Sequence, residues 1–294
     1  MIIFLKRHPL LGFFVLVISL NCFLVFIPYR FVDSRYVNEL LRLILSPSIA
    51  GLLMVRITKG PRDLNNLIEK AFLWQTGVAW YLVALLSAPL LFFITIFSIP
   101  GAIDVFQLPE PSLILKYGGF LILNLFSAPL IEELGWRGFA LPRLQERFGP
   151  LLGTLILGTL SALWHLPLWL SNPEYHGAAA DLIGINLPFF FLRYTGSHLG
   201  TAIIYTWLYN RTNGSIFLPM LFHASINTTF LHFYEAFVPT LFPIYPTHLL
   251  YSKIGFGLLA LLIIGITGGR LGYHLQKKNV HCLTAASRDK QKSE

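Results

Sequence analysis

Two adjacent acids and an arginine end an apolar stretch in LIEELGWRGFALPRLQ, which runs from residue 130 to residue 145. Glu133 and Arg137 stand at positions i and i+4, the spacing that brings two side chains together on one helical face, so we expect them to neutralise each other. Glu132 is rotated by about 100° around the helix and has no such local partner. Unless both acids are solvated at the headgroups, Glu132 faces a cavity or a distant partner, because a lone charge inside a membrane is costly.

Two further apolar stretches carry histidines. His165 lies in SALWHLPLW, two residues before Pro167, where a structural histidine could bond a carbonyl that the proline leaves free. His223 and Asn227 lie in LFHASINTTF at positions i and i+4, so both side chains point into the same space between helices. They could also serve only as hydrogen-bonding residues between helices. Together with Glu132, these residues predict a shared polar cavity formed by three helices.

Hydrolysis by an activated water is the chemistry that best fits a carboxylate, two imidazoles and an amide without an evident serine or cysteine nucleophile. Glu132 could take a proton from water while His165 orients that water or shares the proton. His223 and Asn227 could donate hydrogen bonds to the oxyanion of a peptide carbonyl. A catalytic Zn²⁺ bound by Glu132, His165 and His223 is the alternative, although no local HExxH motif supports it.

The helices that would position these residues are membrane spans. Of the 294 residues, 55% are hydrophobic and only 12% are charged, and the mean hydropathy is +0.64, which differs strongly from a soluble domain. Apolar stretches of about 20 residues, long enough to cross a bilayer, predict eight spans. We place them at residues 10–28, 37–57, 71–99, 114–140, 151–170, 184–209, 215–237 and 252–273.

The basic residues indicate the orientation of the chain. The net charge of +8 could indicate a nucleic-acid partner, but Lys and Arg gather at the even-numbered connections and in both tails. Loops near 100–112, 171–182 and 241–251 contain neither residue. This positive-inside pattern predicts cytoplasmic termini, a lipid bilayer as the surroundings and no nucleic-acid partner. Asn213 and Gly214 predict a tight turn on the cytoplasmic side.

Three segments resemble the motifs of the CPBP intramembrane protease family, which includes the type II CAAX prenyl endopeptidases. They are EELGWRGFALPRL, ALWHLPLW and TWLYNRTNGSIFLPMLFHASIN, and the resemblance covers residues 113–230. The family pattern EExxxR, FxxxH and HxxxN corresponds here to Glu132, Glu133 and Arg137, then His165, then His223 and Asn227. Ser161 stands where the second motif usually has phenylalanine, so the packing beside His165 is expected to differ.

The resemblance implies an all-α, polytopic membrane endopeptidase with about eight transmembrane helices around a polar intramembrane cavity that opens to the cytoplasm. The first glutamate and first histidine would activate water, and the later histidine and asparagine would serve the oxyanion. Glu133 and Arg137 would then support the site structurally. Family members are commonly called metalloproteases, so a Zn²⁺ cofactor stays open. The substrate would be a peptide or protein, either a prenylated protein or a bacteriocin-like peptide, at a prokaryotic plasma membrane.

Two other classes of function stay open. One is a catalytically silent membrane scaffold or immunity protein that binds a partner, and it would tolerate Glu132→Gln and His165→Ala. The other is a transporter, which usually shows inverted repeats and paired broken helices that this sequence lacks. His198 in the sixth span is interpreted as structural or cavity-lining. We divide the chain into N-terminal helices (1–112), a catalytic helical core (113–237), a last helix (238–274) and a basic cytoplasmic tail (275–294).

Overall fold

The computed structural model describes residues 2–26, 46–171, 187–230, 234–238 and 245–274. Throughout these ranges the regular secondary structure is helical, as the all-α expectation requires. The elements are α1 (Ile2–Arg7), α2 (Pro9–Phe26), α5 (Pro47–Thr58), α6 (Pro61–Ala71), α7 (Val78–Phe97), η1 (Ile103–Val105), α8 (Ser112–Leu125), α9 (Ala128–Glu133), η2 (Leu134–Ala140), α10 (Leu141–Phe148), α11 (Pro150–Ser171), α13 (Leu187–Arg211), α14 (Phe217–Thr228), α15 (Tyr234–Phe237) and α16 (Tyr245–Thr267).

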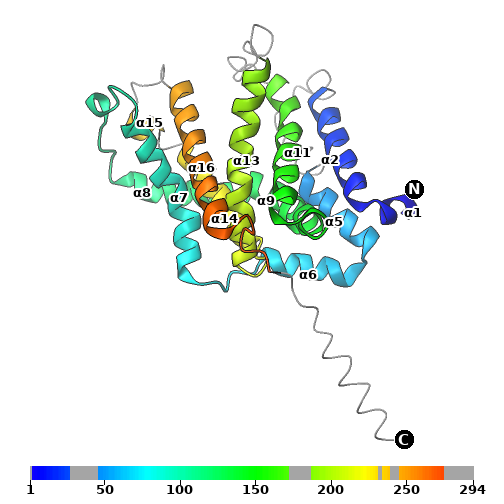
Figure 1. The fold of residues 1–294 in the computed structure, drawn as a ribbon. Helices are drawn as coiled ribbons and strands as arrows, with labels where there is room; N and C mark the ends of the chain where they lie inside the picture. Colours follow the sequence, from blue (N-terminus) through cyan, green and yellow to red (C-terminus); the bar gives the residue numbers. More distant parts are fainter. Residues whose placement is uncertain (1, 27–45, 172–186, 231–233, 239–244, 275–294) are drawn as a thin grey trace, which may run out of the picture.

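The longest helices stand alongside one another. Figure 1 shows α7, α11, α13 and α16 running in the same general direction, with α13 between α11 and α16. The contact between α13 and α16 requires small residues, because a Cβ on Gly200 would lie 3.2 Å from the backbone nitrogen of Gly257. Such close approach of backbones is typical of helices that pack in a membrane.

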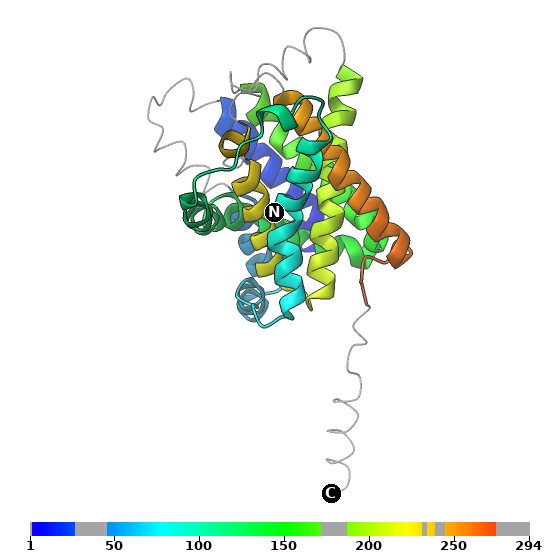
Figure 2. The same ribbon diagram turned by 90° about the vertical axis from the view of Figure 1, so that its left-hand side faces the viewer.

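Two helices lie across this direction. In Figure 1, α6 and α8 run sideways, and in Figure 2 both are seen nearly end-on. The amphipathic helix α6 buries Leu67 and Ala71 and exposes polar residues. None of the residues of α8 is buried, and this helix packs against α14, where two of its polar side chains form hydrogen bonds. Tyr117 shares hydrogen bonds of 3.3 Å with Ser225 and Thr229, and Asn124 donates one of 3.0 Å to Thr228.

Two buried apolar clusters meet at the candidate site. The first lies between α2, α5, η2, α10 and α11 and contains Phe13, Trp136 and Phe139, all of them fully buried. The second lies between α7, α13, α14 and α16 and contains Leu208 and Phe222. Helix α9 precedes η2 and packs against α14, so the two glutamates at its end lie near residues of α14.

Apolar helices are frequent, as a membrane protein requires. Among the described residues, two helical runs are long and apolar enough to cross a membrane, Val78–Phe97 and Ser112–Phe148. Shorter apolar helices cover Pro9–Cys22, Pro47–Thr58, Pro150–His165 and Ser252–Thr267. The count of eight spans stays a prediction, because the segment at 37–57 is described only from residue 46. The segment at 114–140 is divided into α8, α9 and η2.

The end of α13 is closed by a turn and an amide pair. Asn213 and Gly214 adopt positive φ angles of 56° and 79°, so the predicted tight turn is confirmed. Asn210 and Gln145 exchange two hydrogen bonds of 2.8 Å and 3.2 Å, and Asn210 donates a third, of 3.0 Å, to the carbonyl of Leu271. This pair ties α10, α13 and the turn after α16 together.

Candidate active site

The two glutamates end a short helix that is held from the side. Helix α9 contains Pro129 in its first turn, where the missing N–H of proline breaks no helical hydrogen bond. Ser48 on α5 donates a hydrogen bond of 2.7 Å from Oγ to the carbonyl of Leu130. Glu132 and Glu133 are the last residues of α9, and the chain continues as the π-helix η2. π-helical turns are rare and are often found at functional sites.

The π-helix lies directly on α5. A Cβ on Gly135 would lie 2.1 Å from the carbonyl oxygen of Pro47, and a Cβ on Gly51 would lie 2.8 Å from the Cα of Gly135. Only glycine at position 135 therefore permits this approach of the two backbones. The contact fixes the turn that follows the glutamates, and with it the directions of their side chains.

Glu133 is the centre of a buried charged cluster. Arg137 Nη1 lies 2.8 Å from Glu133 Oε2 and 3.1 Å from Oε1, so these side chains meet as their spacing predicts. The guanidinium also lies over the ring of Tyr205, 4.1 Å from its centroid. His223 Nδ1 lies 2.9 Å from Glu133 Oε1, and Nδ1–H is the donor because an ionised carboxylate only accepts.

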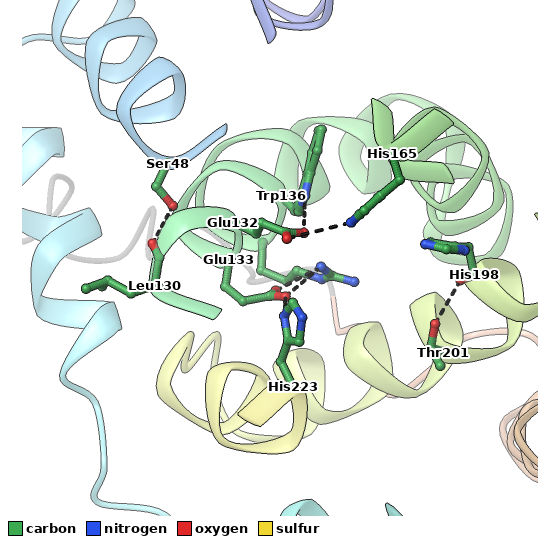
Figure 3. Close-up of polar contacts among 10 residues, drawn as sticks. Ser48, Leu130, Glu132, Glu133, Trp136, His165, His198, Thr201 and His223 are labelled. Carbon is green, nitrogen blue, oxygen red and sulfur yellow. Dashed lines mark hydrogen bonds and ion pairs between the residues drawn. The ribbon is translucent and has the colours of Figure 1, made fainter. Parts of the chain in front are cut away.

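Glu132 has a different set of partners, and one of them is local. Trp136 donates a hydrogen bond of 3.3 Å from Nε1 to Glu132 Oε2. Glu132 therefore has no charged partner four residues away, as its spacing predicts, but a neutral indole N–H binds it, and a search for opposite charges passes over such a donor. The other carboxylate oxygen, Oε1, lies 3.7 Å from His165 Nε2, which is longer than a hydrogen bond. Both atoms face a common space (Figure 3).

The two acids differ in the exposed fraction of their side chains. The Glu132 side chain is 9% exposed and the Glu133 side chain only 1%. The neighbouring His165 side chain, at 20%, is the more accessible of the two histidines. Glu132 and His165 are therefore more accessible than Glu133, which is enclosed by its partners.

The ring of His165 is oriented by its own helix. Its Nδ1–H donates a hydrogen bond of 2.9 Å to the carbonyl of Ser161, so the neutral ring carries its lone pair on Nε2, the nitrogen that faces Glu132. The acceptor is the backbone carbonyl of residue 161, which any residue at this position would supply. The serine that stands here in place of the motif's phenylalanine therefore leaves this hydrogen bond intact. His198 on α13 lies beside the same ring, with 5.1 Å between the ring centroids. Figure 3 shows it directed toward the space between His165 and His223.

His223 and Asn227 lie one turn apart on α14, and both are partly exposed. Since Glu133 occupies Nδ1 of His223, the nitrogen left for a substrate is Nε2. That nitrogen carries a proton at the same time as Nδ1 only when the ring is an imidazolium. The expectation that His223 and Asn227 serve an oxyanion stays a prediction.

The three candidate metal ligands do not form a ligand set. Among the described residues, no group of three His, Cys, Asp or Glu side chains is arranged to hold a metal ion. Glu132 is paired with His165, whereas His223 is bound to Glu133 instead. The donors present therefore do not fit Zn²⁺ in this arrangement.

Comparison with known proteins matches this part of the chain. The family model described as type II CAAX prenyl endopeptidase Rce1-like matches residues 115–229, a range that contains every candidate site residue. CAAX prenyl protease 2 of Methanococcus maripaludis is 29% identical over 197 residues, which make up 63% of this chain and 68% of the archaeal protein.

Proposed function

Because this chain belongs to the CPBP family of intramembrane proteases, we propose that it hydrolyses a peptide bond with a water activated by Glu132 and His165. The observation that supports this assignment is the geometry of the pair. Glu132 Oε1 and His165 Nε2 face each other at 3.7 Å, and both side chains are more accessible than that of Glu133. A carboxylate and an imidazole in this arrangement can share the protons of one water.

The reaction would proceed by proton transfer within this pair. As the water oxygen bonds to the peptide carbonyl carbon, its proton passes to Glu132 or His165 and the carbonyl electrons move to the oxygen. His223, through Nε2–H, and Asn227, through its amide, would stabilise that oxyanion. When the C–N bond breaks, the pair returns a proton to the leaving amine. Glu133 and Arg137 would hold His223 in place throughout.

We further propose that the site lies within a membrane, opens to the cytoplasm and accepts the C-terminal region of a prenylated protein. The apolar helices support the membrane setting, and the basic residues of the connections support the orientation. The description of the family model and the name of the archaeal relative support a lipidated substrate. A bacteriocin-like peptide is the second substrate class.

Cleavage of matched prenylated and unprenylated peptides by purified protein in detergent tests the function. We expect Glu132→Gln to lower kcat by several orders of magnitude, because the base and its charge are both lost. Glu146→Gln is the matched control, since Glu146 is an exposed acid on α10. Retained cleavage in Glu132→Gln protein would refute the assignment, and cleavage of neither peptide by the wild-type protein would favour the scaffold.

A chelator arm in the same assay tests the metal. Because the candidate ligands do not form a set, we expect activity to survive removal of divalent ions. Loss of activity with the chelator and its recovery with Zn²⁺ would show that substrate or metal binding rearranges His223.

A further inference from the structure

The two adjacent acids use the same spacing to reach different kinds of donor. Glu133 meets the cation of Arg137 four residues later, and Glu132 meets the neutral indole N–H of Trp136, also four residues later. The two contacts therefore lie side by side on consecutive residues of one turn. Arg137 neutralises Glu133, whereas Trp136 binds Glu132 and leaves its negative charge in place.

The indole of Trp136 is held rigidly. Its side chain is fully buried. Its ring packs edge-on against Phe13 with centroids 5.6 Å apart and against Trp164 with centroids 5.9 Å apart, and it stacks on Phe14. Rotation of the indole would break all three contacts, so the direction of its N–H is set by the apolar cluster around it.

A fixed donor restricts the carboxylate that it binds. The terminal torsion of a glutamate is broad and roughly two-fold, so an unbound carboxylate turns easily and its two oxygens exchange places. Trp136 holds Oε2, and Oε1 then faces His165 Nε2. The hydrogen bond thus distinguishes the two oxygens and leaves one of them for the reacting water.

We propose that Trp136 is a positioning residue of the active site, which holds Glu132 Oε2 so that Oε1 stays directed at His165. This inference rests on the proposed function, because it assigns Trp136 a part in the water activation that Glu132 and His165 carry out. The role belongs to the N–H and not to the volume of the ring, and the two can be separated by experiment.

Trp136→Phe removes the N–H and keeps an aromatic ring. We expect kcat to fall by roughly ten- to a hundredfold, the usual effect of losing a hydrogen bond to a charged group. KM should change by less than about twofold, because Trp136 is fully buried and does not touch the substrate.

Trp164→Phe is the matched control. Trp164 belongs to the same cluster, and its buried Nε1 has no hydrogen-bond partner among the described residues. The same substitution there removes an indole N–H that binds nothing and keeps an aromatic ring beside His165. A loss of kcat in Trp164→Phe equal to that in Trp136→Phe would overturn the proposal, because packing alone would then explain both.

A second replacement distinguishes the loss of the N–H from an effect of misfolding. 3-Benzothienylalanine at position 136 has the shape of tryptophan and carries sulfur in place of the N–H. We expect it to lower kcat to the level of Trp136→Phe while preserving the melting temperature. Wild-type kcat in this protein would overturn the proposal.

An NMR measurement tests the hydrogen bond of Trp136 independently of the proposed function. In protein labelled with ¹⁵N at its six tryptophans, the indole N–H signal of Trp136 is identified by its loss in Trp136→Phe. That signal should move in Glu132→Gln protein while the signal of Trp164 stays in place, and an unmoved signal would show that the hydrogen bond is absent. If the wild-type protein cleaves nothing, the proposed function fails and the positioning role falls with it, although the hydrogen bond is still measured.

Discussion

Gly135→Ala tests whether the contact between η2 and α5 holds the active site together. The new Cβ would lie 2.1 Å from the carbonyl oxygen of Pro47, 2.3 Å from its carbonyl carbon and 2.9 Å from its Cβ. Non-bonded carbon atoms are most stable at roughly 3.5 Å or more, so the two helices must separate by about 1 Å. No rotamer change relieves this contact, because the opposing atoms are backbone and the Cβ of a proline ring. Overpacking costs about 1–3 kcal/mol, and we expect the upper end of that range.

The displacement would also reach the glutamates, which lie two and three residues before Gly135. A misplacement of 1 Å can cost about a hundredfold in rate. We therefore expect kcat/KM to fall by about ten- to a hundredfold and the melting temperature to fall by roughly 6–12 °C. Thermal unfolding in detergent and peptide cleavage at a temperature well below the transition measure the two effects separately.

Gly118→Ala supplies the control for this experiment. A Cβ at Gly118 would meet nothing within 4 Å, and the residue lies inside helix α8. Alanine favours a helix over glycine by about 1 kcal/mol, so this variant should be as stable as the wild-type protein or more so. If Gly135→Ala matched it in both melting temperature and rate, the reasoning from the close contact would be refuted.

Two further substitutions test the polar contacts. Arg137→Lys should lower the free energy of unfolding by about 1–3 kcal/mol, because lysine loses the planar contact with Tyr205 and one compact ammonium replaces the guanidinium at Glu133; an unchanged melting temperature in detergent would contradict this. Asn210→Ala should cost about 1–3 kcal/mol by leaving the buried amide of Gln145 without its partner. Its kcat at low temperature should equal that of the wild-type protein, and a large loss there would show that this pair affects the distant site.

Contacts between residues close in the chain could be predicted from the sequence, whereas contacts between distant residues could not. The i, i+4 spacing placed Glu133 beside Arg137, and turn chemistry placed Asn213 and Gly214 in a tight turn, because both depend on neighbours within one or two turns of chain. The partner of His223 could not be predicted. Which of two adjacent acids a distant histidine meets depends on the rotation of α9, and the contact of η2 with α5 sets that rotation.

The missed contacts have a common physical origin. Trp136 reads as an apolar residue in any hydropathy pattern, and its N–H becomes informative only once a carboxylate lies beside it. Tyr205 lies on a helix far along the chain, so its position over Arg137 follows from packing alone. Hydropathy also gives the length of an apolar segment and not its direction, so the sideways course of α8 was unpredictable from a count of apolar residues (Figure 1).

Through helix α8, the candidate active site is sensitive to the lipid or detergent that surrounds the protein. None of the residues of α8 is buried, so the free energy of this helix depends on whatever surrounds it. Acyl chains cover its apolar side chains at little cost, whereas a short-chain detergent that lets water reach them weakens its attachment. Only Phe126 to Ile131 separate the end of α8 from Glu132, so a change in the thickness or fluidity of the surrounding lipid acts on the carboxylate of Glu132 through a few residues of chain.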